Sequence, residues 1–237
     1  MVSLIIPAYN ESKIIMNTLR SAAEYLKDNF NSFEIIVVDD GSSDDTANLV
    51  KNECSQWAYR PQVVALPRNM GKGAAVREGA ARAAGEFVFF TDADFPYSLD
   101  FVKAGAEMLK TCGVVCGNRY GDYPFLRKAL SAVYNFFIKK LLRIDVKDIQ
   151  CGIKGFTRGA ARRIFSNCRV DGYAFDTEVI FLAKLMGYDI KPLDVKLAHR
   201  SESKVNVLVD GARMMRDIMK IHKRFKAGEY NFDGSCR

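Results

Sequence analysis

Long hydrophobic runs are absent from this sequence of 237 residues. No stretch reaches the roughly 18 consecutive apolar residues that a transmembrane helix requires. The first residues, 1–7, have neither a basic start nor a cleavage site, so they are typical of a strand and not of a signal peptide. These absences predict a cytoplasmic protein without a membrane-spanning segment.

Paired cysteines and clustered histidines are also absent. The six cysteines have no CxxC spacing, which argues against a zinc site and favours reduced thiols in a cytosolic protein. The chain has one marked imbalance, a net charge of +7, which suits nucleic acid, an anionic membrane surface or a phosphorylated substrate without choosing among them. No nucleic-acid-binding motif accompanies this charge, so we expect no nucleic-acid partner.

The length and the hydrophobic fraction of 49% are those of a globular protein with one large domain. Apolar runs predict strands at 2–6, 33–38, 63–66, 87–91, 114–117 and 190–197. Helical spacing predicts helices at 11–29, 44–53, 73–84, 99–110, 125–143, 174–186 and about 205–226. The alternation predicts a single α/β domain over 1–230, with a mostly parallel central sheet flanked by helices, and a disordered tail at 231–237.

Two carboxylates, Asp92 and Asp94, follow the apolar run 86–91. If the chain stays extended, side chains two apart project to the same side, so both carboxylates would point at one spot. A divalent metal carrying phosphate oxygens would relieve their repulsion. Segments 7–11 and 39–43 follow two other predicted strands, and ligands of parallel sheets gather beyond such carboxyl ends. The sequence therefore predicts one metal–nucleotide site built from all three segments.

Gly71-Lys72-Gly73 precedes a predicted helix. Position 76 is Val, so the last glycine of the dinucleotide-binding G-x-G-x-x-G motif is missing, and the spacing of a Walker loop is absent too. A glycine turn at a helix N-terminus still offers backbone N–H groups to a phosphate, and Lys72 adds charge. We predict a diphosphate contact by Lys72, with Arg77 as a second candidate; the alternative is a tight turn with a solvated lysine.

Five stretches resemble the family 2 glycosyltransferases in their order and separations: SLIIPAYNE (3–11), VVDDGSSD (37–44), NMGKG (69–73), DAD (92–94) and QCGIKGF (150–156). The resemblance covers nearly the whole chain. It implies the GT-A fold, a nucleotide-diphospho-sugar donor and inversion at the anomeric carbon.

The resemblance also implies roles for individual residues on the donor side. Asp39 would accept a hydrogen bond from a base N–H or a ribose hydroxyl, with capping of the next helix as the alternative for it and for Asp40. Asp92 would face the nucleotide, and Asp94 would hold Mg²⁺ or Mn²⁺ against the diphosphate, where the metal neutralises the leaving group. The residues expected to border the base and ribose are Pro7, Ala8, Tyr9 and Glu11, and the candidate metal ligands are Asp92, Asp94 and His199, for which a surface histidine is the alternative.

Three later segments, 150–154, 174–178 and 203–206, resemble the polyprenyl-phosphate transferases, particularly the dolichyl-phosphate glucosyltransferase branch. The mannosyltransferase branch shares much of this pattern. Many relatives carry transmembrane helices and this chain has none, so membrane contact would be peripheral. The basic amphipathic segments 125–143 and 205–226 suit such contact, although core packing is the usual reason for an apolar helix face.

Asp176 is the candidate base, because a saccharide hydroxyl would need deprotonation. Asp176 and Glu178 stand at i and i+2 of a predicted helix and point in different directions, so one of them would be structural. A lipid phosphate, with a second pKa of about 6, is already anionic and would need cations more than a base. The cations available are Arg119, Arg127, Lys154, Arg200 and Lys204, of which Arg119 and Lys204 lie in family-like stretches.

We therefore interpret the sequence as an inverting, metal-dependent enzyme that moves a hexose onto polyprenyl or dolichyl phosphate at a membrane surface, with UDP-glucose as the favoured donor. The alternatives are a transferase of the same fold that acts on a saccharide hydroxyl, and a GDP-mannose-dependent polyprenyl-phosphate mannosyltransferase. From other classes, a non-catalytic sugar-nucleotide-binding protein remains an alternative. A nucleotidyltransferase is disfavoured because 7–11 contains no glycine.

Overall fold

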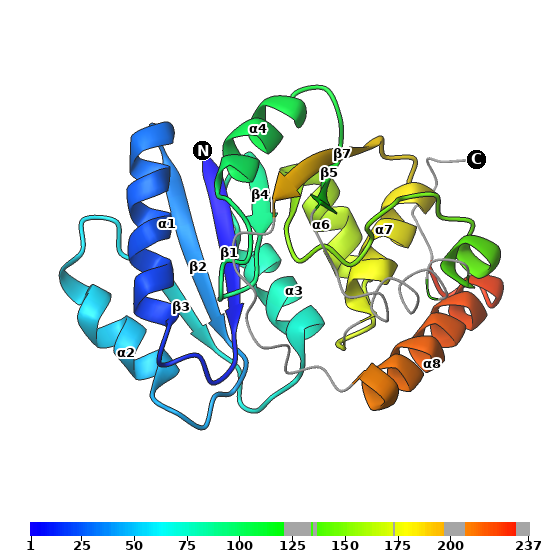
Figure 1. The fold of residues 1–237 in the computed structure, drawn as a ribbon, viewed down its shortest axis with the longest axis horizontal. Coiled ribbons are helices and arrows are strands. Elements are labelled where there is room, and N and C mark those ends of the chain that lie inside the picture. The colour runs from blue at the N-terminus through cyan, green and yellow to red at the C-terminus, as the bar shows by residue number, and fades with distance from the viewer. Residues whose placement is uncertain (121–133, 135–136, 173, 197–206, 231–237) are drawn as a thin grey trace.

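Seven strands form one sheet that has helices on both faces (Figure 1). The structure is a computed structural model that describes residues 1–120, 134, 137–172, 174–196 and 207–230. The strands are β1 (Val2–Ala8), β2 (Phe33–Asp39), β3 (Gln62–Ala65), β4 (Phe87–Phe90), β5 (Val114–Tyr120), β6 (Lys154–Thr157) and β7 (Ile190–Lys196). Their order is β3-β2-β1-β4-β6-β5-β7, and only β6 runs antiparallel to its neighbours. The predicted α/β fold with a mostly parallel sheet is confirmed.

The helices cover the two faces in separate groups. They are α1 (Ile15–Asn29), α2 (Thr46–Glu53), the 3-10 turn η1 (Cys54–Gln56), α3 (Lys72–Arg82), α4 (Asp100–Met108), α6 (Arg158–Asn167), α7 (Phe175–Leu185) and α8 (Val207–Lys226). Alternate residues of one strand face opposite layers: Ile5 belongs to the core with α3, α6 and α7, whereas Leu4 and Ile6 belong to the core with α1 and α4. Burial on both faces explains why the central strands are almost continuously apolar.

Two elements, β6 and α6, are missing from the sequence-based prediction. β6 has only four residues and begins with a lysine, so it lacks the apolar signal of the other strands. Its Gly155 is required by packing, because an added Cβ would lie 2.3 Å from a ring atom of Phe89. α6 has a recognisable start, since the Thr157 hydroxyl accepts a hydrogen bond from the Ala160 N–H over 3.3 Å, and apolar residues at helical spacing.

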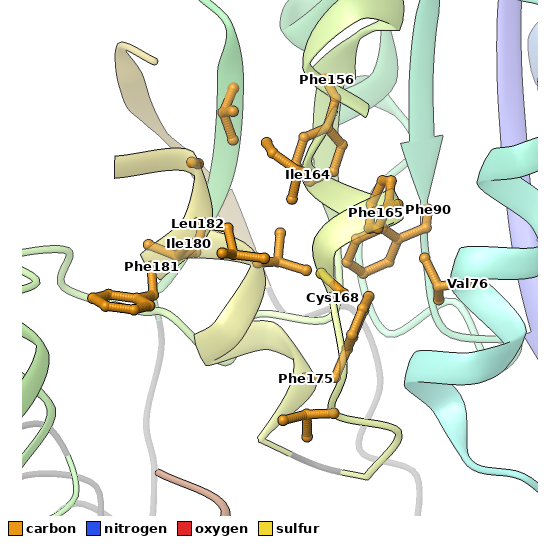
Figure 2. Packing of buried hydrophobic residues seen from close by; sticks show 14 of the residues in the cluster. Val76, Phe90, Phe156, Ile164, Phe165, Cys168, Phe175, Ile180, Phe181 and Leu182 are labelled. Atoms are coloured by element: carbon orange, nitrogen blue, oxygen red, sulfur yellow. The ribbon is translucent and has the colours of Figure 1, made fainter. Parts of the chain in front are cut away.

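The aromatic core reaches up to the carboxyl end of β4. Phe90, the last residue of β4, packs against Phe156, Phe165 and Phe175 with ring centroids 6.1, 6.4 and 6.1 Å away (Figure 2). The ammonium groups of Lys72 and Lys154 each lie 5.5 Å from the centroid of the same Phe90 ring. The closely packed aromatic rings therefore support the ammonium groups of two lysines at this edge of the sheet.

Two expected helices extend into residues outside the described ones. Of the helix expected at 125–143, residues 134 and 137–142 are helical, and the remainder is not described. The C-terminal helix is present from Val207 to Lys226, and the expected tail at 231–237 lies outside the described residues. Within the described ranges, we find no helix with the length and apolarity needed to cross a bilayer.

Candidate active site

Three strand ends converge at one edge of the sheet. Ala8 and Asp39 are register partners at the ends of β1 and β2, and β4 ends beside β1 with Phe90 opposite Ile5. Loops after β1 and β2 are joined directly: the Asn10 N–H donates to the Ser42 hydroxyl over 2.9 Å, and the Glu11 N–H donates to the Thr46 hydroxyl over 2.9 Å. Neighbouring parallel strands force this meeting, as expected from the sequence.

Asn10 is a residue of this edge that the sequence analysis did not single out. Its backbone has φ +55°, a left-handed conformation that asparagine tolerates better than most residues. Its side-chain oxygen accepts from the Ser43 N–H over 2.8 Å. These contacts fix the segment that carries Tyr9, which is 41% exposed.

Asp39 and Asp40 are both buried but have different hydrogen-bond partners. Asp40 accepts from the N–H groups of Met70 and Gly71 over 2.7 and 2.8 Å. It therefore holds residues 70–73, here called the glycine loop, and does not cap α2. Burial raises the pKa of Asp40 despite these two donors. Asp39 accepts from the Ser42 N–H over 3.3 Å through Oδ2, while among the described residues its buried Oδ1 has no partner. A buried acceptor left open in this way fits a ligand donor.

The glycine loop uses its backbone N–H groups within the protein. Gly71, at φ +100°, donates to Asp40, and the Gly73 N–H donates to the carbonyl of Asp171 over 2.8 Å. Those two N–H groups are therefore not open to a phosphate, contrary to what the glycine turn suggested. The cation of Lys72 is the part of this loop that is suited to an anion.

Lys72 lies between two carboxylates. Its Nζ is 2.7 Å from Asp92 Oδ1 and 3.7 Å from Asp176 Oδ2, and its side chain is 22% exposed. Burial opposes the charge, but Asp176 and then Asp92 outweigh it and hold the pKa of Lys72 above its ordinary value. Lys72 therefore stays cationic, and part of its side chain is exposed, unlike that of Lys154.

Asp176 is held by two lysines and is nearly buried. Lys154, which is fully buried, reaches Asp176 Oδ1 over 2.5 Å and the Cys151 carbonyl over 2.7 Å. Burial favours the neutral acid, yet Lys154 and then Lys72 outweigh it and keep the pKa of Asp176 below its ordinary value. Such a carboxylate is a poor proton acceptor. Lys154, with no exposed surface, is also out of reach of a lipid phosphate, which corrects its selection as a phosphate-binding cation.

The chain turns directly after β4. The Phe95 N–H donates to the Asp92 carbonyl over 3.2 Å, and Phe95 has φ +40°. Asp92 and Asp94 are therefore not in extended chain, and alternation along a strand does not govern their directions. Asp94 is partly exposed in this turn.

Gly152 gives Asp92 its space. A Cβ added at Gly152 would lie 1.8 Å from Asp92 Oδ2, and the Gly152 N–H donates to the hydroxyl of buried Tyr97 over 3.3 Å. The roles of Gly152 and Tyr97 were not predicted from the sequence. The glycine between Cys151 and Ile153 was visible only as part of a motif.

Arg119 is committed to a carboxylate within the protein. Its Nε and Nη2 lie 2.6 and 2.7 Å from the two oxygens of Asp148, which also accepts from the Arg119 N–H over 3.0 Å. Burial opposes the charge, but Asp148 more than compensates and raises the pKa of Arg119. A two-pronged contact of this kind orders the arginine and neutralises much of its attraction for an acceptor phosphate.

Several predicted positions do not enter this description. His199, Arg200 and Lys204 lie outside the described residues, as does Arg127. Arg77 pairs with Asp171 and donates to the Val170 carbonyl over 3.1 Å, so its guanidinium is engaged by residues 170–171. Within the described ranges, no group of three or more His, Cys, Asp or Glu side chains is arranged to hold a metal ion.

Comparisons with known proteins agree with the geometry. The family Glycosyl transferase family 2 matches residues 3–165. The chain is 34% identical to a dolichyl-phosphate beta-glucosyltransferase of Dictyostelium discoideum, over 96% of this chain and 75% of that protein. It is 29% identical to the Homo sapiens protein of the same name, over 98% of this chain and 78% of the other.

Solved structures with the same fold include a glucosyl-3-phosphoglycerate synthase from Mycobacterium tuberculosis, in complex with Mn²⁺, UDP-glucose and phosphoglyceric acid. Its TM-score is 0.69 at 20% identity, covering 94% of this chain and 80% of that one. A mannosyl-3-phosphoglycerate synthase from Rubrobacter xylanophilus has a TM-score of 0.70 at 17% identity, covering 100% and 77%. These likenesses establish the GT-A fold. Because the family match covers well over half of the sequence, the chain belongs to glycosyltransferase family 2.

Proposed function

We propose that this glycosyltransferase moves glucose from UDP-glucose onto a polyprenyl phosphate, of which dolichyl phosphate is one example. The observation that carries the proposal is the near-full-length similarity to dolichyl-phosphate beta-glucosyltransferases, at 34% identity over 96% of the chain for the Dictyostelium protein. The described site adds support, because it offers an open acceptor for a base and a cation for a diphosphate.

The donor would lie across the carboxyl ends of β1, β2 and β4. Asp39 Oδ1 would accept from a base or ribose donor, and Tyr9, in the segment 7–11, would border the nucleoside. Lys72 would contact the diphosphate and attract it by charge. Asp39 Oδ1 would be hydrogen-bonded only when a nucleotide supplies an N–H or O–H group at the right place. The site would therefore distinguish nucleotides by their hydrogen-bond donors.

The residues fit a divalent metal that is shared with the substrate. Mg²⁺ is commonly held by one or two carboxylates together with substrate phosphates and water, so a third protein ligand among the described residues is not required. Asp94 would hold the ion, with His199 as a candidate from outside the described residues, and Asp92 would face the donor beside Lys72. When bound, such an ion would stabilise the negative charge of the departing diphosphate.

The acceptor phosphate would need no general base. One of its anionic oxygens would attack the anomeric carbon from the face opposite the leaving group, while the bond to the nucleotide diphosphate breaks and its electron pair leaves with UDP. Asp176, already engaged by Lys72 and Lys154, would act as an anchor that positions Lys72. An acceptor hydroxyl would require a free base, and the contacts of Asp176 disfavour that alternative.

Contact with a membrane surface would bring the lipid acceptor to the site. α8 exposes basic side chains, namely Arg216, Lys220, Lys223 and Lys226, together with the apolar side chains of Met219 and Phe225 at 55% and 45% exposure. Exposed cations beside exposed apolar side chains are typical of a helix at an anionic lipid interface. We propose peripheral attachment at the cytoplasmic face.

A donor screen tests the function. UDP- and GDP-linked glucose and mannose would be incubated with the protein, Mg²⁺ or Mn²⁺ and a short polyprenyl phosphate, and the product would be partitioned between organic and aqueous phases. An acid-labile glycosyl phosphate in the organic phase, formed from UDP-glucose, is the expected result. A water-soluble glycoside would overturn the lipid acceptor, and preferential use of GDP-mannose would overturn the donor.

A substitution of Asp94 tests the metal dependence. Asp94→Ala should abolish turnover, and chelation with EDTA should do the same to the wild-type protein until Mg²⁺ or Mn²⁺ is restored. Unchanged consumption of nucleotide sugar by Asp94→Ala would contradict the assignment of Asp94 as the metal ligand.

A further inference from the structure

Glu178 is a fully buried acid that the proposed reaction does not use. Its Oε2 accepts hydrogen bonds from the backbone N–H groups of Arg169 and Val170, each over 2.7 Å. Its Oε1 accepts from the hydroxyl of Tyr230 over 2.6 Å. Both oxygens are therefore used inside the protein, and this carboxyl group ties α7 to the nearby residues 169–170 and to Tyr230, which lies 52 residues further along the chain.

The segment that Glu178 holds, residues 169–172, supports the glycine loop. The Asp171 carbonyl accepts from the Gly73 N–H over 2.8 Å, and an added Cβ at Gly71 would lie 2.4 Å from that same carbonyl oxygen. An added Cβ at Gly73 would lie 2.4 Å from the carbonyl oxygen of Val170. Contacts this close exist only because both loop positions are glycine, so a shift of residues 169–172 would move the backbone on either side of Lys72.

Arg77 strengthens the same support from α3. Its guanidinium donates to the Val170 carbonyl over 3.1 Å and pairs with the Asp171 carboxylate. The support is thus bonded to the first turns of α3, the helix that begins at Lys72. Residues 169–172 are thus held by Gly73 and Arg77 of α3 and by Glu178 of α7, which leaves this segment little freedom.

Tyr230 connects Glu178 to the end of α8. Its ring is buried and lies edge-on to Phe181 of α7 at 6.3 Å, and Phe181 in turn contacts Phe225 of α8 at 5.3 Å. Burial and the hydrogen bond to Glu178 raise the pKa of Tyr230, so its hydroxyl stays protonated and able to donate. The chain of contacts therefore runs from the last helix, through Glu178, to the loop that carries Lys72.

We propose that Glu178 is a positioning residue for the donor site, and that Tyr230 fixes its orientation. By holding residues 169–172 against Gly71 and Gly73, Glu178 sets where the ammonium group of Lys72 meets the donor diphosphate. The inference rests on the proposed function in one respect, namely that a nucleotide diphosphate binds beside Lys72.

Three substitutions separate positioning from other roles. In Glu178→Gln, the amide oxygen can accept from both backbone N–H groups, and the amide nitrogen can donate to the Tyr230 hydroxyl oxygen, so the bracing geometry is retained without the charge. Glu178→Ala removes all three hydrogen bonds. Tyr230→Phe removes only one of them and keeps the aromatic packing, which also provides a variant that folds if Glu178→Ala does not.

The test is the affinity of the full chain for UDP with Mg²⁺ or Mn²⁺, measured by calorimetry. We expect Glu178→Gln to bind within about twofold of wild type, and Tyr230→Phe to bind about two- to tenfold more weakly, the range that one hydrogen bond accounts for. Glu178→Ala should bind at least about tenfold more weakly. Steady-state assays of the variants should show a higher KM for the nucleotide sugar and a kcat within about threefold of wild type at saturating donor.

Ser3→Ala controls for loss of stability alone. Ser3 is buried at the opposite end of β1 and accepts from the Gly85 N–H over 2.8 Å, so its substitution also removes a buried hydrogen bond to the backbone. It should lower the melting temperature without changing the affinity for UDP. If wild type binds UDP but Tyr230→Phe and Glu178→Ala bind equally well, the positioning role is refuted. If wild type itself fails to bind UDP, the proposed function falls, and this role with it.

Discussion

Gly152→Ala is the sharpest single test of the donor-site geometry. Gly152 is buried, and its backbone lies outside the left-handed region, so alanine can adopt the same conformation without strain. The added methyl group would lie 1.8 Å from Asp92 Oδ2 and 2.7 Å from Asp92 Cγ, distances at which one of the two must move. The effect of the substitution therefore falls on Asp92 and on its 2.7 Å contact with Lys72.

The magnitude follows from the size of that displacement. To reach an ordinary contact distance, the Asp92 carboxylate must retreat by more than about 1 Å, and a misplacement of that size at an active site can cost about a hundredfold in rate. We therefore expect kcat/KM for the nucleotide sugar to fall about a hundredfold, or about 2.7 kcal/mol of transition-state stabilisation. The measurement is the steady-state rate of UDP release with a short polyprenyl phosphate as acceptor.

Gly159→Ala is the matched control. A Cβ at Gly159 would meet nothing within 4 Å, and the residue lies in the first turn of α6. This variant should keep wild-type activity and gain about 0.5–1 kcal/mol of stability, because alanine restricts the unfolded chain. The result that would refute the reasoning is a Gly152→Ala enzyme with kcat/KM within about threefold of wild type.

A double-mutant cycle identifies the cause of the loss. If the methyl group acts by displacing the Asp92 carboxylate, then adding Gly152→Ala to an Asp92→Ala protein should cost little further activity or stability, because the atoms that clash are already gone. Full additivity of the two substitutions would place the effect of Gly152→Ala elsewhere, for example in the 3.3 Å hydrogen bond between the Gly152 N–H and Tyr97.

Three further predictions concern charges and thiols. Asp176→Asn leaves buried Lys154 without its carboxylate, so the free energy of unfolding in urea should fall by about 3–5 kcal/mol. Because the folded-state pKa of Asp176 lies below its ordinary 3.8, this deficit should be full above about pH 5, begin to shrink below pH 3.8 and disappear as the pH falls through the lower folded-state pKa. A deficit independent of pH would contradict the pairing. Arg119→Lys cannot reproduce the two-pronged contact with Asp148, and losing one charge-assisted hydrogen bond of about 1.5–3 kcal/mol should lower Tm by at least about 3 °C, so an unchanged Tm would count against the contact. The five described cysteines are buried, and burial raises their thiol pKa values, to about 11 for Cys54, so at pH 8 the native protein should expose at most one thiol to Ellman's reagent, whereas two fast-reacting thiols would disprove it.

The sheet could be predicted from the sequence because its central strands are buried on both faces and therefore consist of nearly continuous apolar residues. That the segments following β1, β2 and β4 lie at one edge was equally accessible, since parallel strands bring their carboxyl ends together. β6 escaped for a physical reason: its two ends are Lys154 and Thr157, and Gly155 inside it serves the ring of Phe89. A four-residue segment with a lysine at one end and a glycine inside lacks the apolar run by which the other strands were predicted.

The partners of the cations could not be predicted. Lys154 and Arg119 are separated in sequence from Asp176 and Asp148 by 22 and 29 residues, and only the unforeseen antiparallel β6 and its preceding loop bring these groups together. A lone basic residue in a sequence therefore looks available for phosphate, although the folded chain has already neutralised it. The extended geometry assumed for Asp92 and Asp94 also failed, because the chain turns after Phe90: the Phe95 N–H donates to the Asp92 carbonyl, and the Ala93 carbonyl accepts from the Thr18 hydroxyl.

The hydrogen-bond partners of the acids distinguish those suited to a ligand from those that hold the site together. Asp39 and Asp40 are adjacent and equally buried, and composition cannot tell them apart. Asp40 has both oxygens occupied by backbone donors, as does Asp148 by Arg119 and Glu178 by its three donors, so these acids hold loops and cations in place. Asp39 retains a buried oxygen without a partner among the described residues, and that costs folding free energy unless a ligand supplies the donor. The acid left unsatisfied is therefore the one that binding is expected to complete, and the satisfied acids explain how it is held ready.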